Sequence, residues 1–439
     1  MKIHWFTPLP PERTDVGNFS ERVCRVLQAR CDLTVWSHSQ HAGRFSKPRN
    51  SGSYQVLPYS AVDAHRESLN RADAIFYNLG NNAAFHREII RIMRQYPGVA
   101  ILHDLSLFEC VSSVYRERLG GDQMFLDLVR FEYGEELAKK IGDWLLADDE
   151  ARKMVDVASM CPFAKHATLG AWGIISHTEI ATGSELGSDT RPRWTLPLPF
   201  PSEDVSLLGI AGGERLDMCV FGYIGGPNRR LDEILQAMAS FSKSEALFLH
   251  IAGAVNPSLE IVQKVKELGL ENQVKIHGFL SDEKLDTLLA QVGLVLNLRF
   301  PTRGEASGSL LRAWSQGAAV VVTDTGFYGK IPDEVVWKVS PRREQEDLFA
   351  LWELLLGDRS LIDSKRRNGI EYLKTQHSVE PYVERILEIA QTPSDLRAPS
   401  ILPMLYQRFG LVAASTFVLP EDVDTVWIER LDAEMSSWF

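Results

Sequence analysis

Short apolar runs alternate with amphipathic stretches through both halves of the chain, and this alternation limits the possible folds more than any other feature. The apolar runs of the first half are KIHWF, DLTVWS, YQVLPY, DAIFYN, VAILHD and WGIISH. Those of the second half are DMCVFGYI, ALFLHIAG, VKIHGF, LVLNLR and AAVVVTD. Stretches with helical spacing, such as NFSERVCRVLQAR and GSLLRAWSQ, separate them. Strands that alternate with helices form parallel sheets, so we predict an α/β protein with two Rossmann-like domains.

A proline-rich segment without periodicity, SDTRPRWTLPLPFPSED, separates the two halves. We therefore predict an N-terminal domain over residues 1–196 and a C-terminal domain over residues 197–378. The helical pattern VEPYVERILEIA predicts a closing helix within 379–395, and an apolar extension follows over 396–439. This extension is rich in aromatic side chains, so we expect it to pack on the body of the protein or on a second subunit.

Composition excludes several classes of protein. The 439 residues are 45% hydrophobic and 24% charged, with a formal net charge of −11, which is typical of a globular protein. The negative net charge argues against a nucleic-acid-binding protein that attracts its ligand through a general positive potential. Five scattered cysteines without a C-x-x-C pair indicate reduced thiols in the cytoplasm. No run approaches the ~18 apolar residues of a membrane-spanning helix, which leaves peripheral membrane contact open.

The loop FGYIGGPNRRLDEIL follows the first predicted strand of the second half. Ligands of open α/β sheets bind beyond the carboxyl ends of strands, so this loop is a candidate site. It brings Asn228, Arg229 and Arg230 to the start of a helix, where amides and two guanidinium groups suit a pyrophosphate. The alternative is a solvated arginine pair on a helix.

The stretch LNLRFPTRGEASGSLLRAWSQGAAVVVTD holds a second candidate loop. Arg303 and Glu305 follow a strand, and Ser307, Gly308 and Ser309 open an apolar helix. Gly308 lets a ligand approach the backbone, the first amides can hold an anion, and Glu305 can accept hydrogen bonds from sugar hydroxyls. The alternative is that Glu305 and the serines only cap the helix.

The first half also places polar residues at predicted strand ends. Asn81 and His86 follow the strand DAIFY, and His103 and Asp104 follow the strand VAIL. These groups would line one crevice, although a single histidine is more often structural. Gly17 follows the first strand, where a ligand could approach closely, and the alternative there is an ordinary turn.

These motifs resemble the GT-B glycosyltransferases, and among them the retaining enzymes of family 4 that take part in bacterial surface-polysaccharide assembly. The resemblance spans about residues 1–392 and is strongest over 219–338, where FGYIGGPNRR, HIAG, KIHGFLSDEKLDTLLAQVGLVLNLR and GEASGSLLRAWSQGAAVVVTDTG follow the family's order. It implies two domains that face each other across a cleft. The second would bind a nucleotide-diphosphate sugar and the first a saccharide or lipid-linked acceptor, with no metal or other cofactor.

The matching motifs also imply roles for individual residues of this sequence. The resemblance implies three catalytic residues: His103 near the sugar and acceptor, Arg229 at the departing diphosphate, and Glu305 on the donor sugar. The donor-binding residues would be Gly17, Asn228, Arg230, Arg303, Ser307, Gly308 and Ser309. The acceptor-side residues would be Asn81, His86 and Asp104. Two departures stand out: Ala313, or Arg312 if one residue is deleted, replaces the family's ribose-binding second glutamate, and Tyr223 follows Gly222 in place of a Gly-Arg step.

The leading prediction is a cytoplasmic, metal-independent hexosyltransferase of retaining type. Peripheral contact with the inner face of the membrane and self-association through the extension stay open. The alternatives are a nucleotide-sugar 2-epimerase or phosphorylase of the same fold, a non-catalytic nucleotide-sugar-binding partner, and a Rossmann-like protein with another phosphorylated ligand.

Overall fold

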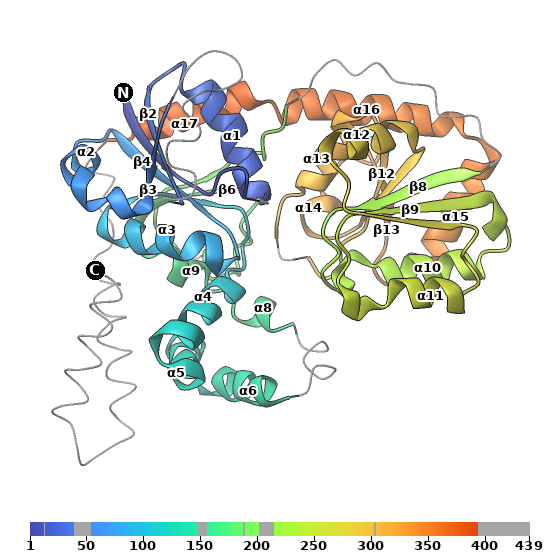
Figure 1. Cartoon of the computed structure of the whole chain (residues 1–439), viewed down its shortest axis with the longest axis horizontal. Helices are drawn as coiled ribbons and strands as arrows, with labels where there is room; N and C mark the ends of the chain where they lie inside the picture. Colours follow the sequence, from blue (N-terminus) through green and yellow to red (C-terminus); the bar gives the residue numbers. More distant parts are fainter. Residues whose placement is uncertain are drawn as a thin grey trace. The chain divides into compact units, whose positions relative to one another are not determined.

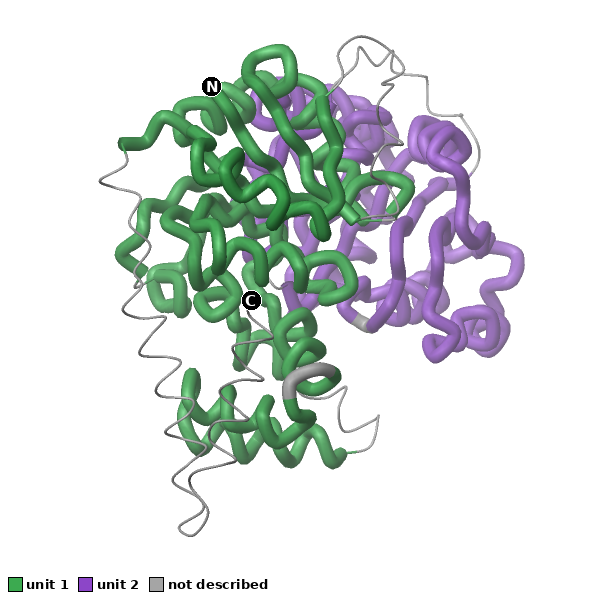
Figure 2. Tube along the Cα trace, turned by 60° about the vertical axis from the view of Figure 1, so that its left-hand side comes forward, with its two compact units in different colours: residues 1–196, 380–439 green, residues 197–379 purple. Residues whose placement is uncertain are grey.

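The computed structural model divides the chain into two compact units (Figure 2). The first comprises Met1–Leu196 and Glu380–Phe439, and the second comprises Pro197–Val379. The described residues are 1–12, 14–38, 54–147, 156–187, 189–201, 215–302 and 304–393. The predicted extension over 396–439 and the predicted donor residue Arg303 lie outside them.

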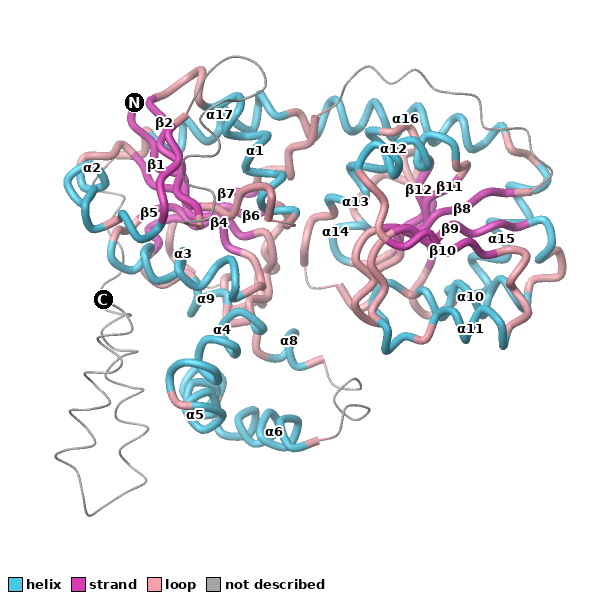
Figure 3. Tube along the Cα trace, viewed as in Figure 1, coloured by secondary structure: helices cyan, strands magenta, loops and turns pink. Residues whose placement is uncertain are grey.

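The first unit is built on a seven-stranded parallel sheet (Figure 3). Its strand order is β3-β2-β1-β4-β5-β6-β7, so the direction of winding reverses between β1 and β4. The strands are β1 (Lys2–Phe6), β2 (Asp32–Ser37), β3 (Gln55–Pro58), β4 (Ala74–Leu79), β5 (Gly98–Leu102), β6 (Ala171–Ser176) and β7 (Arg193–Thr195). The six predicted strands are present, and β7 is an additional short edge strand inside the segment that was predicted as a linker.

Helices cover this sheet and extend beyond it. They are α1 (Asp15–Leu27), α2 (Arg66–Asn70), α3 (Ala83–Gln95), α4 (Phe108–Val114), α5 (Gly121–Tyr133), α6 (Glu135–Leu146), α8 (Val157–Met160), α9 (Ala164–Ala167) and α17 (Val379–Ala390), with 3₁₀ turns at Tyr59–Ala61 and Asp63–His65 and a π turn at Tyr115–Leu119. Helix α1 begins earlier than its apolar spacing suggests, because Thr14 caps it. The closing helix α17 belongs to the first unit from Glu380 onward.

A helical insertion between β5 and β6 contains α4, α5, α6, α8 and α9, and α5 and α6 form a pair beside the sheet (Figure 1). Aromatic side chains attach this pair to α4. Phe108 of α4 packs edge-to-face against Phe125 and Trp144, with ring centroids 5.8 and 5.9 Å apart. Buried aromatic pairs of this geometry add about 0.5–1.5 kcal/mol to area burial, which gives the insertion its own anchoring contacts.

The second unit repeats the doubly wound plan with six parallel strands in the order β10-β9-β8-β11-β12-β13. The winding reverses between β8 and β11. The strands are β8 (Leu216–Phe221), β9 (Leu247–Ala252), β10 (Val274–Gly278), β11 (Leu294–Asn297), β12 (Ala319–Thr323) and β13 (Trp337–Val339). The sequence predicts all of these except β13.

The helices of the second unit enclose an apolar core around the sheet. They are α10 (Leu231–Ser240), α11 (Ile261–Glu267), α12 (Asp282–Gln291), α13 (Gly308–Ser315), α14 (Gly326–Gly329), α15 (Glu344–Gly357) and α16 (Ser360–Gln376), with 3₁₀ turns at Pro227–Arg229, Ser244–Ala246 and Pro257–Leu259. Trp314 of α13 is fully buried within this core. A Cβ on Gly369 of α16 would lie only 2.5 Å from Cδ1 of Trp314, so the glycine allows the two helices to pack closely.

Replacing Gly369 with alanine should therefore destabilise the second unit, because the added methyl group overpacks the helix contact. Overpacking of this kind commonly costs about 1–3 kcal/mol. Gly357, at the end of α15, is a matched control, since a Cβ there would meet no atom within 4 Å. Thermal or urea unfolding should show a loss for Gly369→Ala and none for Gly357→Ala. Equal stabilities for the two variants would contradict the packing.

Candidate functional site

Each unit has a place where the strand order reverses, and most of the predicted site residues follow the strands on either side of it, whereas His103 and Asp104 follow β5, the strand next to β4. In the first unit these strands are β1 and β4, and in the second they are β8 and β11. Connections leave such a pair toward opposite faces of the sheet, which leaves a crevice at the carboxyl ends where ligands bind. Most of the polar loops therefore lie where ligands usually bind in such sheets, at the carboxyl ends of the strands.

Arg229 lies against the end of β8 in the second unit. Its side chain is 9% exposed, and its Nη1 donates to the carbonyl of Phe221 over 3.4 Å. A Cβ on Gly222, which has φ of +103°, would lie 3.1 Å from Nη2 of Arg229. Glycine at this position therefore makes room for the guanidinium group at the strand end.

Arg230 and Asn228 occupy different environments from Arg229. Nε of Arg230 lies 3.2 and 3.3 Å from the carboxylate oxygens of Glu344, and its Nη1 lies 2.7 Å from Glu233. Burial raises the pKa of Glu344, and Arg230 partly offsets this rise. The carbonyl of Asn228 accepts from the amide of Phe300 over 2.9 Å. Arg230 is thus held by carboxylates, and Asn228 joins the loops after β8 and β11.

The first turn of α13 is organised by Asn297, which ends β11 and is 3% exposed. Its Nδ2 donates to Oγ of Ser307 over 3.1 Å, and its Oδ1 accepts from Oγ of Ser309 over 2.9 Å. Oγ of Ser307 also accepts from the amide of Leu310, so Ser307 is the N-cap. The two hydroxyl groups are used within the protein. The amides of Gly308 and Ser309 are in the first turn, where a helix supplies no acceptor of its own.

Glu305 lies in a small group of polar residues near α13. Its Oε2 accepts from Oγ1 of Thr302 over 3.2 Å. Burial raises the pKa of the neighbouring Tyr328. The charges of Arg299, Glu305 and Arg229 also act on this pKa, so these three side chains lie near the Tyr328 hydroxyl group. Sequence reasoning missed Arg299 and Tyr328: Arg299 was treated only as the end of a strand, and no motif singled out Tyr328.

His86 in the first unit is 2% exposed and lies beneath the loop after β4. Its Nδ1 is 3.1 Å from the backbone carbonyl of Asn78, and a Cβ on Gly80 would be 2.9 Å from its Nε2. Burial lowers the pKa of His86 to about 4. The ring therefore supports the loop from inside as a neutral group.

Asn81 and Asp104 join the loops after β4 and β5. The amide of Asn81 donates to Oδ2 of Asp104 over 2.9 Å, and its Oδ1 accepts from the amide of Cys110 over 3.2 Å. Its Nδ2 also bonds Glu109.

Gly17 is buried in the first turn of α1, where a Cβ would lie 3.5 Å from the backbone of Leu9. This is an ordinary van der Waals distance, and the nearest atom would be Cγ2 of the cap Thr14 at 3.3 Å, so the contact with the loop after β1 does not itself require glycine.

His103 belongs to a cluster of aromatic rings. Its ring centroid lies 4.6 Å from Phe19 and 4.9 Å from His177, and Tyr382 of α17 packs 5.6 Å from Phe19. Burial, His177 and His86 lower the pKa of His103 well below its ordinary value. His177 directly follows β6 and is a site residue that the sequence did not single out, because it ends an otherwise apolar run.

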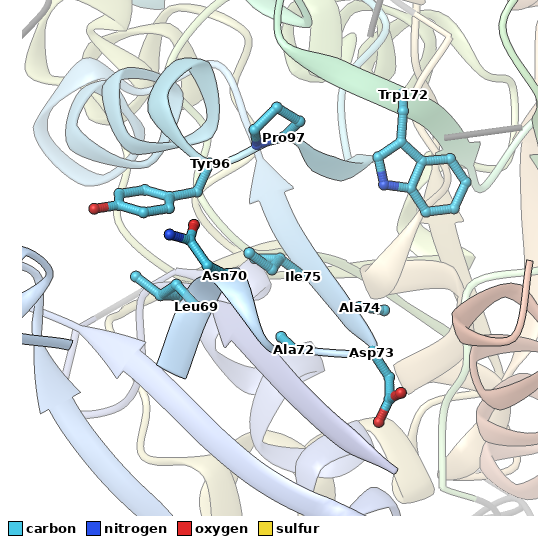
Figure 4. Close-up of a pocket in the computed structure, with 9 residues that line it drawn as sticks. All are labelled: Leu69, Asn70, Ala72, Asp73, Ala74, Ile75, Tyr96, Pro97 and Trp172. Atoms are coloured by element: carbon cyan, nitrogen blue, oxygen red, sulfur yellow. The ribbon is translucent and has the colours of Figure 1, made fainter. Parts of the chain in front are cut away.

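A separate pocket opens at the amino ends of the strands in the first unit's sheet (Figure 4). Its volume is about 220 Å³. It is lined by Leu69, Asn70, Ala72, Asp73, Ala74, Ile75, Tyr96, Pro97 and Trp172. These residues lie at the amino ends of β4, β5 and β6, whereas the predicted residues of this unit follow the carboxyl ends of strands, so the pocket is separate from them.

Two features are absent from the part of the chain that the structure describes. No three histidine, cysteine, aspartate or glutamate side chains there come together in a group that could hold a metal ion. No helix in the same ranges combines the length and apolar character needed to cross a membrane.

Comparison with known proteins gives a family for part of the chain. Residues 223–376, which include Arg229 and Glu305, match the family of glycosyl transferases group 1. No curated protein sequence matches the chain at a significant level. The match lies entirely within the second unit, and it supports glycosyl transfer from a nucleotide sugar.

Several solved structures share the fold at low identity. HepE of Anabaena in complex with UDP is 14% identical, with 90% of this chain and 100% of that chain covered and a TM-score of 0.59. WaaG, a glycosyltransferase involved in lipopolysaccharide biosynthesis, is 15% identical, with 89% and 100% covered and a TM-score of 0.56. Sucrose-phosphate synthase from Thermosynechococcus elongatus is 14% identical, with 88% and 97% covered and a TM-score of 0.57. The predicted GT-B fold, with two parallel-sheet α/β domains, is confirmed.

The buried, neutral state of His86 predicts a pH dependence of stability. Its pKa is about 4 in the folded protein and near its ordinary value of 6.5 in the unfolded chain, so acid favours unfolding. Stability should fall as the pH drops from about 6.5 toward 4, by roughly 3 kcal/mol for this group at most. The variant His86→Gln, which can still donate to Asn78 but does not titrate, should show a flatter loss in melting experiments across this range. An unchanged pH slope would contradict the assignment.

Proposed function

We propose that the protein is a retaining glycosyltransferase of family 4 that moves a hexose from a nucleotide-diphosphate sugar to a hydroxyl of a saccharide or lipid-linked acceptor. The proposed setting is bacterial polysaccharide or glycoconjugate synthesis. One observation carries the proposal: Arg229, Glu305 and the first turn of α13 gather at the strand-order reversal of the second unit. The group 1 match over residues 223–376 supports it.

The diphosphate is assigned to Arg229 and the first-turn amides of α13. A helix N-terminus presents backbone N–H groups and positive potential to an anion, and a guanidinium group adds charge-assisted hydrogen bonds. Such groups stabilise charge that grows as the glycosidic bond breaks. Because they supply this charge, the proposed reaction needs neither a metal nor another cofactor. Arg230 acts differently in this account, since Glu344 and Glu233 already balance its charge.

The sugar of the donor is assigned to Glu305, and the acceptor to the first unit. A carboxylate accepts hydrogen bonds from sugar hydroxyls and favours positive charge on the breaking sugar. HepE of Anabaena, which shares the fold, has been solved in complex with UDP-glucose. His103 would contact the sugar and acceptor, while Asn81, His86 and Asp104 would shape the acceptor side. The proposed compartment is the cytoplasm, with peripheral contact at the inner face of the membrane, and self-association is assigned to the extension.

A second candidate function is a non-catalytic nucleotide-sugar-binding partner of another transferase. The residues at the position of the family's second glutamate favour it. Ala313 is fully buried, and Arg312 lies 2.8 Å from Asp286 and 2.9 Å from Asp282. Neither residue offers a carboxylate for ribose. Binding of a nucleotide sugar without turnover would select this alternative.

Three substitutions test the proposed roles by steady-state kinetics with a panel of nucleotide sugars. Arg229→Ala should lower turnover about a hundredfold, with a smaller effect on donor binding, because its charge acts mainly in the transition state. Glu305→Gln keeps the shape but removes the charge, and should impair transfer. His103→Ala should retain nucleotide binding, which belongs to the other unit, and reduce transfer.

Arg343→Ala is the matched control, because Arg343 lies in the same unit as Arg229 and its side chain is 71% exposed. It should transfer sugar at the wild-type rate. Near-wild-type transfer by folded Arg229→Ala and Glu305→Gln would contradict the proposed roles of these residues.

A further inference from the structure

The side-chain amide of Asn78 lies between a backbone carbonyl and the ring of His103. Asn78 is fully buried on β4, its Nδ2 donates to the carbonyl of Phe6 over 3.0 Å, and its Oδ1 lies 3.1 Å from Nε2 of His103. Phe6 ends β1 and His103 follows β5, the two strands that flank β4. One amide thus connects three neighbouring strands at the reversal point of the first unit.

Hydrogen-bond chemistry allows only one arrangement of these groups. A carbonyl oxygen can only accept, so the NH₂ group of Asn78 must face Phe6 and its oxygen must face His103. The amide oxygen is also only an acceptor, so Nε2 of His103 must carry a hydrogen. In the neutral ring, Nδ1 then has no hydrogen and is the one ring atom that accepts.

The surroundings of His103 favour the neutral ring. Phe19 packs edge-on against it, and His177 from the end of β6 lies on the same ring cluster. His177 itself has Nδ1 at 3.1 Å from the carbonyl of Leu196, which requires that Nδ1 to donate. A positive charge on His103 would have to be held among these rings and next to His177, so a protonated ring is disfavoured.

We propose that Asn78 is a positioning residue that holds His103 in its Nε2–H tautomer, so that Nδ1 accepts a hydrogen bond from a hydroxyl group of the sugar or acceptor. The inference rests on the proposed function, because such an acceptor serves a site that binds hydroxyl groups. Asparagine suits this position since it both donates to Phe6 and accepts from His103. Aspartate could only accept, and alanine could do neither.

His86 supplies an internal reference for the opposite tautomer. Its Nδ1 lies 3.1 Å from the backbone carbonyl of Asn78, so this nitrogen must donate and the ring must be the Nδ1–H form. The two rings therefore contact the same asparagine, one through its side chain and the other through its backbone, and they should show opposite tautomers.

The direct experiment is nitrogen NMR of the full chain labelled with ¹⁵N-histidine, near neutral pH. The two-bond correlation pattern of a histidine distinguishes both neutral tautomers and the cation, and loss of one pattern in His103→Gln assigns His103. We expect the Nε2–H pattern for His103 and the Nδ1–H pattern for His86. An Nδ1–H or cationic His103 would overturn the proposal.

Variants of Asn78 then connect the tautomer to transfer. Asn78→Asp should keep the His103 pattern, because a carboxylate oxygen still accepts from Nε2–H. Asn78→Ala should give a mixture of tautomers and lower kcat about tenfold, because a ring with its hydrogen on Nδ1 cannot accept a hydrogen bond from the hydroxyl group. The donor KM should change little. Asn297→Ala, which removes a buried asparagine from the other unit, should leave the His103 pattern unchanged.

The results for the wild type and the Asn78 variants distinguish a failure of the proposed tautomer from a failure of the proposed function. A folded Asn78→Ala that keeps the wild-type tautomer pattern, or that keeps wild-type kcat, overturns the inference. Should Asn78→Ala fail to fold, the wild-type and Asn78→Asp spectra decide, and a changed His103 pattern in Asn78→Asp counts against it. A wild-type chain that shows the Nε2–H pattern but transfers no sugar contradicts the proposed function and leaves the tautomer assignment standing.

Discussion

The reversal of strand order in each parallel sheet is the constraint on which the candidate site depends. From β8 the chain winds through β9 and β10 toward one edge, and from β11 it winds toward the other. The loops after β8 and β11 must therefore diverge, although both begin at the carboxyl ends of neighbouring strands. The hydrogen bond from the amide of Phe300 to the carbonyl of Asn228 holds them together. Arg229 therefore follows one strand of the reversal, β8, and Glu305 and α13 follow the other, β11.

A buried asparagine stands beside the reversal point in both units. Asn78 lies on β4 and Asn297 ends β11, and each of these strands is the first that follows the reversal. Both side chains use donor and acceptor atoms: Asn78 bonds Phe6 and His103, and Asn297 bonds Ser307 and Ser309. Because an unsatisfied buried polar group costs about 1–3 kcal/mol, each amide strongly restricts the groups around it. The asparagines thus fix the polar groups that a ligand would meet.

Most of the fold could be predicted because strands of a parallel sheet are buried on both faces and appear as continuous apolar runs. The missed strands β7 and β13 are short, half-exposed edge strands, so they lack this signal. The start of α1 was also misplaced: the helical spacing was recognised only from Asn18 onward, whereas the helix begins at Asp15, because Thr14 caps it.

The candidate loops could be found because they follow strand ends, but their internal bonding could not. Arg230 is held by Glu344, and His86 is held by the backbone of Asn78. Ser307 is held by Asn297, which belongs to the preceding strand. Sequence spacing gives the position of a side chain along the chain, whereas these bonds depend on how strands and loops meet in three dimensions. Arg299, Tyr328 and His177 were missed for the same reason.

Calorimetric titration can decide whether the second unit binds a nucleoside diphosphate at the first turn of α13. The wild-type chain and Gly308→Pro would be titrated with nucleoside diphosphates and their monophosphates. Proline is well tolerated at the first position of a helix, so this variant removes one amide and adds bulk while α13 is kept. The account predicts that one diphosphate binds the wild type at least about tenfold tighter than its monophosphate, a difference of about 1.4 kcal/mol that Gly308→Pro abolishes. Equal affinities for diphosphate and monophosphate, or a Gly308→Pro variant that binds the diphosphate as tightly as the wild type, would contradict it.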